Sequence, residues 1–256
     1  MSRNDPRLLA GTAIVTGAGG GLGRAITIEL AHRGLHVAAL GRHADTLSDT
    51  ASANPAHIHP IPCDITDESA LRAAVKQASD IAPLTLLINN AATYPRRDFL
   101  DETPQSFRAT MDVNFTALMT ATHIALETFV ETGFGRILNV ATFADLNPLP
   151  TASAYSVSKG AARLLTRALK ADLADRFPEI VITDWMPGML ATSMGLPDGL
   201  PPEVSAKWGA DLALWHDPTL TGATFEQDHE ILPPRGLKRK LKDALLLRRP
   251  KPRQLT

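Results

Sequence analysis

A glycine-rich segment near the amino terminus constrains this chain more than any other feature. Residues 16–23 read Thr-Gly-Ala-Gly-Gly-Gly-Leu-Gly and separate an apolar stretch at 12–16, expected to be a strand, from a predicted helix at 22–33. Gly17 permits a tight turn, Gly21 leaves the backbone open to a pyrophosphate, and Gly23 allows the helix to pack closely on the sheet. Phosphates would then meet free backbone N–H groups at the helix N-terminus. A plain turn is the alternative for this segment taken alone.

Short apolar stretches alternate with helical patterns along most of the chain. We expect strands near 12–16, 35–40, 57–61, 84–89, 136–140 and 180–185, and helices near 22–33, 44–53, 67–80, 104–130 and 154–176. Such alternation predicts an α/β fold with a doubly wound parallel sheet, the Rossmann arrangement. With 256 residues, 44% of them hydrophobic, the chain can form one large domain, which we place at 1–232.

Tyr155 and Lys159 are four residues apart at the start of the predicted helix at 154–176, so their side chains share one face. An ammonium near a phenol favours the phenolate and brings its pKa, normally about 10, towards the range of a general acid or base. The alternative is a half-buried tyrosine beside a solvated lysine. The glycine-rich segment upstream favours the chemical interpretation.

Several motifs in order now give the chain a family resemblance over residues 8–232. It resembles the short-chain dehydrogenase/reductase family in these segments: the glycine-rich segment 16–23, Asp64 in Cys-Asp-Ile-Thr, Asn89-Asn90-Ala91-Ala92, Asn114 in Met-Asp-Val-Asn-Phe, Tyr155 with Lys159, and Pro187-Gly188 followed by Thr192. The resemblance implies an enzyme that interconverts a ketone or aldehyde and an alcohol with a nicotinamide cofactor, and a homodimer or homotetramer.

The resemblance also implies roles for individual residues. Tyr155 would be the catalytic acid/base, Lys159 would hold the nicotinamide ribose and lower the tyrosine pKa, and Asn114 would support a water-linked proton path. Asp64 would contact the adenine, Asn90 the central cofactor region, and 187–192 the nicotinamide amide. The expected cofactor-binding set is Gly17, Gly21, Leu22, Gly23, Arg42, Asp64, Asn90, Tyr155, Lys159, Pro187, Gly188 and Thr192.

Two positions depart from the family pattern. The family's catalytic serine stands thirteen residues before the tyrosine, and that position is Thr142 here. Its hydroxyl can still donate a hydrogen bond to a carbonyl oxygen, but the β-branch adds a methyl group at the reacting centre. Ala92 replaces the usual glycine after Asn89-Asn90. The threonine affects rate and substrate shape more than the type of reaction, and Ala92 is a milder departure that adds one methyl group close to the expected cofactor.

The residue after the second predicted strand indicates which nicotinamide cofactor the chain prefers. Arg42 stands near the position where an NAD enzyme presents an acidic residue to the ribose 2′-hydroxyl. A guanidinium suits a 2′-phosphate, so we expect NADP(H) in preference to NAD(H). Gly20 counts against this, because many NADP-dependent relatives carry a basic residue there. An arginine after a strand can also simply be solvated.

Substrate contacts are expected in the segment 189–216, which is broken by glycines and prolines and could form a lid. Trp208 and Trp215 would favour an apolar pocket, although core packing is the commoner role of a single large aromatic residue. Phe143 and Tyr94 follow predicted strand ends and could also line the pocket.

The last residues, 233–256, form a predicted basic extension with an amphipathic helix at 236–247. Nine basic residues and one acidic residue between 235 and 253 contrast with a net charge of −1 for the whole chain. Docking on the protein's own acidic surface or on a neighbouring subunit, and contact with an anionic membrane or an acidic partner, are both open. Nucleic acid is not expected, because no aromatic residues are interleaved for base stacking.

The remaining features suggest an ordinary cytoplasmic protein. No run reaches the roughly eighteen apolar residues of a membrane span, and the one cysteine, Cys63, fits packing in a reducing compartment. His57 and His59 share a strand face but lack a recognisable third metal ligand, so no metal is expected. We therefore predict an NADP(H)-dependent carbonyl/alcohol oxidoreductase; the alternative is a catalytically weak NADP(H)-binding sensor or recruitment protein that acts through its basic extension.

Overall fold

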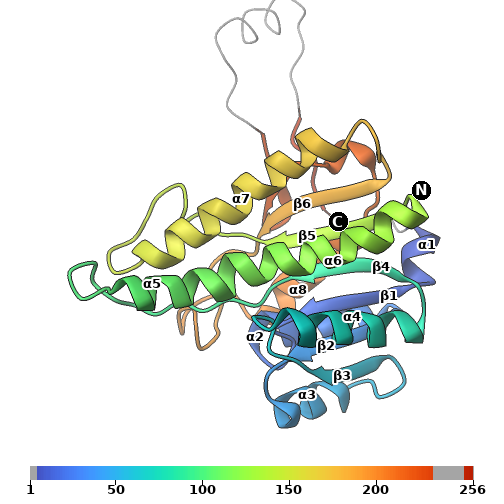
Figure 1. The fold of residues 1–256 in the computed structure, drawn as a ribbon, viewed down its shortest axis with the longest axis horizontal. Helices are drawn as coiled ribbons and strands as arrows, with labels where there is room; N and C mark the ends of the chain where they lie inside the picture. Colours follow the sequence, from blue (N-terminus) through green and yellow to red (C-terminus); the bar gives the residue numbers. More distant parts are fainter. Residues whose placement is uncertain (1–4, 233–250, 256) are drawn as a thin grey trace, which may run out of the picture.

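One sheet organises the protein, and Figure 1 shows its strands stacked across the centre of the molecule. The computed structural model describes residues 5–232 and 251–255. In this part the strand order is β3-β2-β1-β4-β5-β6-β7-β8, parallel except that β8 runs antiparallel to β7. The strands are β1 (Thr12–Thr16), β2 (His36–Gly41), β3 (Ile58–Pro62), β4 (Leu84–Asn89), β5 (Gly135–Val140), β6 (Ile180–Met186), β7 (Thr224–Glu226) and β8 (His229–Ile231). The predicted doubly wound parallel sheet is confirmed.

Helices cover both faces of the sheet. In Figure 1, α4, α6 and α7 lie on the near face, with α2 and α8 behind. The helices are α1 (Pro6–Leu9), α2 (Gly21–His32), α3 (Ala44–Ala51), α4 (Glu68–Ile81), α5 (Pro104–Met111), α6 (Ala117–Thr132), α7 (Ser153–Leu173) and α8 (Pro202–Leu214), with a π-helix η1 (Asp112–Thr116) and a 3-10 turn η2 (Pro218–Leu220). Because both faces are covered, β1, β4, β5 and β6 are buried along their whole length.

The predicted helix at 104–130 is interrupted. Thr103 caps the start of α5 by a capping box with Ser106, and the α-helical turn then widens into η1 before α6 begins. Helix α6 ends at Gly133, whose φ of 68° places it in the left-handed region. The interruption matters because Asn114 lies inside the π-helical turn.

The segment 189–216 splits into two parts. Residues 202–214 form α8, which packs against α2 and contributes Ala210, Leu212 and Leu214 to the core with no exposed surface. Gly209 leaves room for the fully buried Trp185, because a Cβ there would lie 2.7 Å from the indole ring. The prediction of a lid therefore applies only to residues 189–201.

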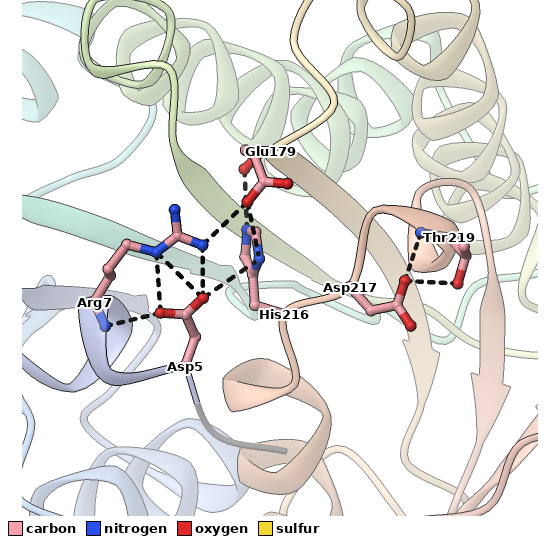
Figure 2. A network of polar contacts seen from close by, with 6 residues as sticks. All are labelled: Asp5, Arg7, Glu179, His216, Asp217 and Thr219. Carbon is pink, nitrogen blue, oxygen red and sulfur yellow. Dashed lines mark hydrogen bonds and ion pairs between the residues drawn. The ribbon is translucent and has the colours of Figure 1, made fainter. Parts of the chain in front are cut away.

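A polar network opposite the carboxyl ends of the strands ties the amino terminus to the start of β6 (Figure 2). Arg7 bonds Asp5 at 2.7 Å and Glu179 at 3.0 Å, and the almost fully buried His216 lies between these two carboxylates. His216 also contacts the backbone carbonyl of Glu179 at 3.0 Å. Desolvation lowers the pKa of His216. This network holds α1, β6 and the segment after α8 together.

The carboxyl-terminal residues return to the sheet edge. Glu230 N–H donates to the carbonyl of Arg253 at 2.9 Å, and Leu255 N–H donates to the carbonyl of Asp228 at 2.8 Å. The Leu255 side chain is buried, and Arg253 pairs with Glu230 at 2.7 Å. Residues 251–255 thus pack on the main domain, although the sequence assigns them to a separate extension. The basic helix predicted at 236–247 lies outside the described residues.

Candidate active site

The glycine-rich segment turns sharply between β1 and α2. Gly17 has a φ of +69°, and a Cβ at Gly23 would lie 2.1 Å from the carbonyl oxygen of Gly17. Asn90, directly after β4, donates its side-chain N–H to the carbonyl of Thr16 at 2.9 Å. The neighbouring strand end therefore fixes the turn, and around Gly20 the backbone faces open space, since a Cβ there would meet no atom within 4 Å.

Arg42 and Asp64 follow the carboxyl ends of β2 and β3. Asp64 accepts hydrogen bonds from Thr66 N–H at 3.0 Å and from the Thr66 hydroxyl at 2.8 Å. These bonds lower the pKa of Asp64, with a smaller contribution in the same direction from the Arg42 charge. Arg42 is exposed at this end of the site.

Asn114 is fully buried and joins the loop after β4 to helix α7. Its side-chain oxygen accepts from Thr93 N–H at 2.7 Å, and its amide donates to the Thr93 carbonyl at 2.9 Å and to the Ser158 hydroxyl at 3.0 Å. Ser158 in turn donates to the backbone carbonyl of Tyr155 at 2.7 Å. Asn114 therefore connects the chain after β4 with the first turns of α7.

Tyr155 lies in α7, close to Thr142, which follows β5. Burial raises the pKa of the Tyr155 phenol, and the Thr142 hydroxyl opposes this rise. The ring of Tyr94 lies 4.5 Å from that of Tyr155, centroid to centroid. The two hydroxyl groups expected at the reacting centre are thus brought together, and the phenol is held in its protonated form.

Lys159, one turn after Tyr155 in α7, has only 2% of its surface exposed. Its Nζ donates to the backbone carbonyl of Val140 at 2.9 Å. Burial lowers the pKa of Lys159 to about 8, while the nearby Asp184 acts in the opposite direction. Tyr94 and Asp145 act in the same direction as burial on the Tyr155 pKa. That Lys159 lowers this pKa stays a prediction.

A buried carboxylate that sequence reasoning missed lies on β6. Asp184 accepts from the Thr166 hydroxyl at 2.6 Å and from the Asn139 amide at 3.5 Å, and burial raises its pKa to about 7. A second missed group is the ion pair of Asp145 and Arg163, 2.9 Å apart and largely buried, which joins the loop carrying Thr142 to α7. Neither Asp184 nor the Asp145–Arg163 pair stands in a recognisable local motif, because the bonded residues, Thr166 with Asp184 and Asp145 with Arg163, are eighteen residues apart in the sequence.

Pro187 and Gly188 follow β6, where Gly188 has a φ of +88° and packs on the Gln227 side chain. Thr192 reaches back across the site, since a Cβ on Gly21 would lie 3.3 Å from its methyl carbon. The segment after β6 therefore lies opposite the start of α2. This is the place at which a bound dinucleotide would be enclosed.

One cavity of about 1000 Å³ joins these features at the carboxyl ends of the strands. All the predicted cofactor-binding residues line it: Gly17, Gly21, Leu22, Gly23, Arg42, Asp64, Asn90, Tyr155, Lys159, Pro187, Gly188 and Thr192. Thr142, Phe143 and Tyr94 line it as well, whereas Asn114 lies behind the wall. Trp208 and Trp215 pack against the core instead, so the pocket that they were expected to line is formed by other residues.

His57, just before β3, and His59, in β3, are joined by His36 of β2. His36 Nδ1 lies 3.1 Å from His59 Nε2, and the His36 ring stacks on that of His57. Within residues 5–232 and 251–255, however, no group of three or more histidine, cysteine, aspartate or glutamate side chains is arranged to hold a metal ion. In the same residues no helix combines the length and apolar character needed to cross a membrane.

Comparison with known proteins agrees with this geometry. The family model described as short chain dehydrogenase matches residues 11–198. Galactitol 2-dehydrogenase (L-tagatose-forming) of Cereibacter sphaeroides is 33% identical over 79% of this chain and 80% of its own. D-erythrulose reductase of Gallus gallus is 33% identical over 76% and 77%, and carbonyl reductase [NADPH] 2 of Sus scrofa is 31% identical over 76% and 78%.

The chain therefore belongs to the short-chain dehydrogenase/reductase family. It is an NAD(P)-dependent oxidoreductase that acts on alcohol or carbonyl groups of a small molecule. The fold also matches the crystal structure of an Agrobacterium tumefaciens protein named a "putative gluconate dehydrogenase", with a TM-score of 0.80 and 23% identity over 88% of this chain and 96% of the other. That likeness concerns the fold alone.

Proposed function

We propose that the protein is an NADP(H)-dependent reductase of a ketone or aldehyde, with Tyr155 as the proton donor. The observation that carries the proposal is that Tyr155 and Thr142 line the same cavity as the glycine-rich turn, where the Thr142 hydroxyl opposes the rise in the Tyr155 pKa that burial causes. Relatives named for the reduction of D-erythrulose and L-xylulose support the reducing direction.

The residues around the cavity fit a dinucleotide. The turn at Gly17 and the open space at Gly20 expose backbone N–H groups to a pyrophosphate at the start of α2. Asp64 and Arg42 would hold the adenosine end, Asn90 the centre, and Lys159 the nicotinamide ribose. When bound, the cofactor supplies or accepts the hydride. Arg42 also favours a 2′-phosphate, and the NADPH in the name of the Sus scrofa relative is consistent with that choice.

The protein's own residues account for the proton. The Thr142 hydroxyl donates a hydrogen bond to the carbonyl oxygen and stabilises the charge that develops there. The Tyr155 phenol then gives its proton to that oxygen. Because burial raises the pKa of Tyr155, the phenol is protonated at neutral pH, as a general acid in reduction requires. Lys159 and Asn114 hold the positions of the cofactor and of α7 and support reprotonation of the tyrosinate.

Replacing Tyr155 by phenylalanine tests this assignment. The variant should bind NADPH as the wild type does, in a fluorescence titration, yet lose carbonyl reduction by a factor of at least about 100. Arg42→Asp should weaken NADPH binding more than NADH binding. Undiminished turnover by Tyr155→Phe would exclude the mechanism, and normal NADPH binding without turnover by the wild type would favour the cofactor sensor.

We also propose a homo-oligomer, as the family membership implies. Val157 and Leu164 are 52% and 58% exposed on one side of α7, and Met119 and Val130 are partly exposed on α6. Burial of these apolar side chains against a second copy would remove them from water. Light scattering of the purified protein measures its mass directly, and a monomer whose mass does not change with concentration would contradict the proposal.

A further inference from the structure

The substrate end of the cavity carries an unbalanced positive charge. Two arginines follow one another in the loop after β4, and both line the cavity. Arg97 is neutralised, because its guanidinium lies 2.8 Å from Glu102, whose side chain is 3% exposed. Arg96 has no acidic partner among the residues that the structure describes.

Arg96 is nevertheless held in place. Its Nη2 donates to the backbone carbonyl of Gly195 at 3.4 Å, and its guanidinium carbon lies 5.6 Å from the ring centroid of Tyr94. The first contact joins the loop after β4 to the segment 189–201, and the second places the charge over an aromatic face. Neither contact neutralises the guanidinium, so N–H groups remain for a ligand.

The charge is near the reacting centre. Tyr94 is also the residue whose ring centroid lies 4.5 Å from that of Tyr155. The Arg96 guanidinium carbon therefore lies no farther from the Tyr155 ring than the sum of 5.6 Å and 4.5 Å. That span suits a small molecule whose carbonyl group meets Tyr155 while its other end meets Arg96.

Other charged groups on the cavity wall do not cancel Arg96. Asp64 lies close enough to Arg42 for the two charges to interact, at the end formed by β2 and β3. Glu226 on β7 pairs in register with Met186, beside the expected nicotinamide site. The wall formed by lining residues from 93–97, 142–144, 149–151 and 189–196 contributes Arg96 and the neutralised Arg97 as its charged residues. Asp145, just outside this lining, is paired with Arg163.

We propose that the substrate is a carbonyl compound, or the corresponding alcohol, that carries a carboxylate, and that Arg96 binds this carboxylate. The inference rests on the proposed function and deepens it. A planar guanidinium matches a carboxylate through two parallel hydrogen bonds. Neutral ketoses, by contrast, gain nothing from an unpaired arginine at this position.

A matched pair of aldehydes tests the inference. The protein as purified is given NADPH and either 4-carboxybenzaldehyde or its methyl ester, which lacks the negative charge and adds one methyl group. In each reaction one hydride from NADPH and one proton convert the aldehyde to the benzylic alcohol, with NADP⁺ as the other product. Wild type, Arg96→Gln, Arg96→Lys and the control Arg108→Gln are compared. Arg108 is exposed on α5 and does not line the cavity.

The expected result is a wild-type preference for the acid that Arg96→Gln lowers by at least about tenfold in kcat/KM, mainly through KM. The ester should be unaffected, Arg96→Lys should restore part of the preference, and Arg108→Gln should behave as the wild type. An equal loss of kcat/KM for the acid and the ester in Arg96→Gln, or a wild type with no preference for the acid, would overturn the inference. Turnover of the ester would still support the proposed function in either case.

Binding provides the second measurement if neither aldehyde is reduced. Calorimetric titration of the NADP⁺-bound protein with terephthalate, the dianion of benzene-1,4-dicarboxylic acid, should show binding that Arg96→Gln weakens about tenfold. Absence of an Arg96-dependent difference overturns the inference. Benzyl phosphate, titrated in the same way, distinguishes the anion: tighter Arg96-dependent binding of the phosphate than of the carboxylate would refute the carboxylate assignment.

Discussion

The contact between Gly23 and Gly17 gives a stability prediction that can be worked through. A methyl group at Gly23 would lie 2.1 Å from the Gly17 carbonyl oxygen and 2.5 Å from the Asn90 amide nitrogen. Overpacking of this kind costs about 1–3 kcal/mol and occasionally more, and the upper end applies because a backbone atom must move. Higher helix propensity returns about 1 kcal/mol to alanine. Gly23→Ala should therefore lose about 2 kcal/mol of unfolding free energy, or roughly 4–8 °C in Tm.

The matched control is Gly20→Ala, three residues earlier in the same turn. A Cβ at Gly20 meets no atom within 4 Å, and its φ of −168° is open to any residue. The loss of a glycine at the helix N-cap and the lower entropy of the unfolded chain should cancel to within about 1 kcal/mol. Urea unfolding and NADPH titration of both variants measure the difference. Equal stability and equal NADPH affinity of the two would refute the steric argument.

Three more predictions follow from single positions. Gly20→Lys fills the open space near the expected phosphate and should tighten NADPH binding several-fold, with a smaller effect on NADH; the reverse order in a fluorescence titration would contradict the preference for NADP(H). The pKa of Asp184 is raised from 3.8 to about 7, so the free energy of unfolding of the wild type should fall as pH rises between these values. From pH 5 to pH 8 the Asp184→Asn variant should therefore gain roughly 3 kcal/mol in unfolding free energy relative to the wild type. Parallel curves of unfolding free energy against pH for the two proteins would contradict this. Leu255→Ala should cost about 2–4 kcal/mol in urea unfolding, because the side chain is buried, whereas a loose carboxyl terminus would give no change.

The sequence predicts the central sheet well, because strands that are buried on both faces consist of continuous runs of apolar residues. Strands β1, β4, β5 and β6 are short apolar runs, and their predicted positions agree with the observed ones to within about a residue or two. The cavity-lining set could be named in advance for a related reason. Its members stand in local motifs at the carboxyl ends of these strands, where parallel connections bring them to one edge.

Other parts depend on contacts that the sequence does not display. Strands β7 and β8 have three residues each, too few for a periodic pattern, and the docking of 251–255 depends on pairing with β8. The apolar stripe of Trp208 and Trp215 suits a pocket or a core equally, and the packing of α8 on α2 decides between them. The loop sequence around Arg96 carries no motif. Its place near the reacting centre is known only from the contacts of Tyr94 with Tyr155 and with Arg96.

The π-helical turn η1 fixes how far α5 is rotated about the helix axis relative to α6. Each residue in a helix turns the chain by about 100°, so loss of one residue between 112 and 116 would rotate α5 by that angle relative to α6. Ser106, Ala109 and Thr110 of α5 would then leave the cavity wall at the same time as Asn114 left Thr93. A substitution in α5 changes one side chain of the cavity wall. A change of length would instead replace all the cavity-lining residues of α5 and break the Asn114–Thr93 contact at the same time. Lineages of this enzyme should therefore vary α5 in composition and keep its spacing to Asn114.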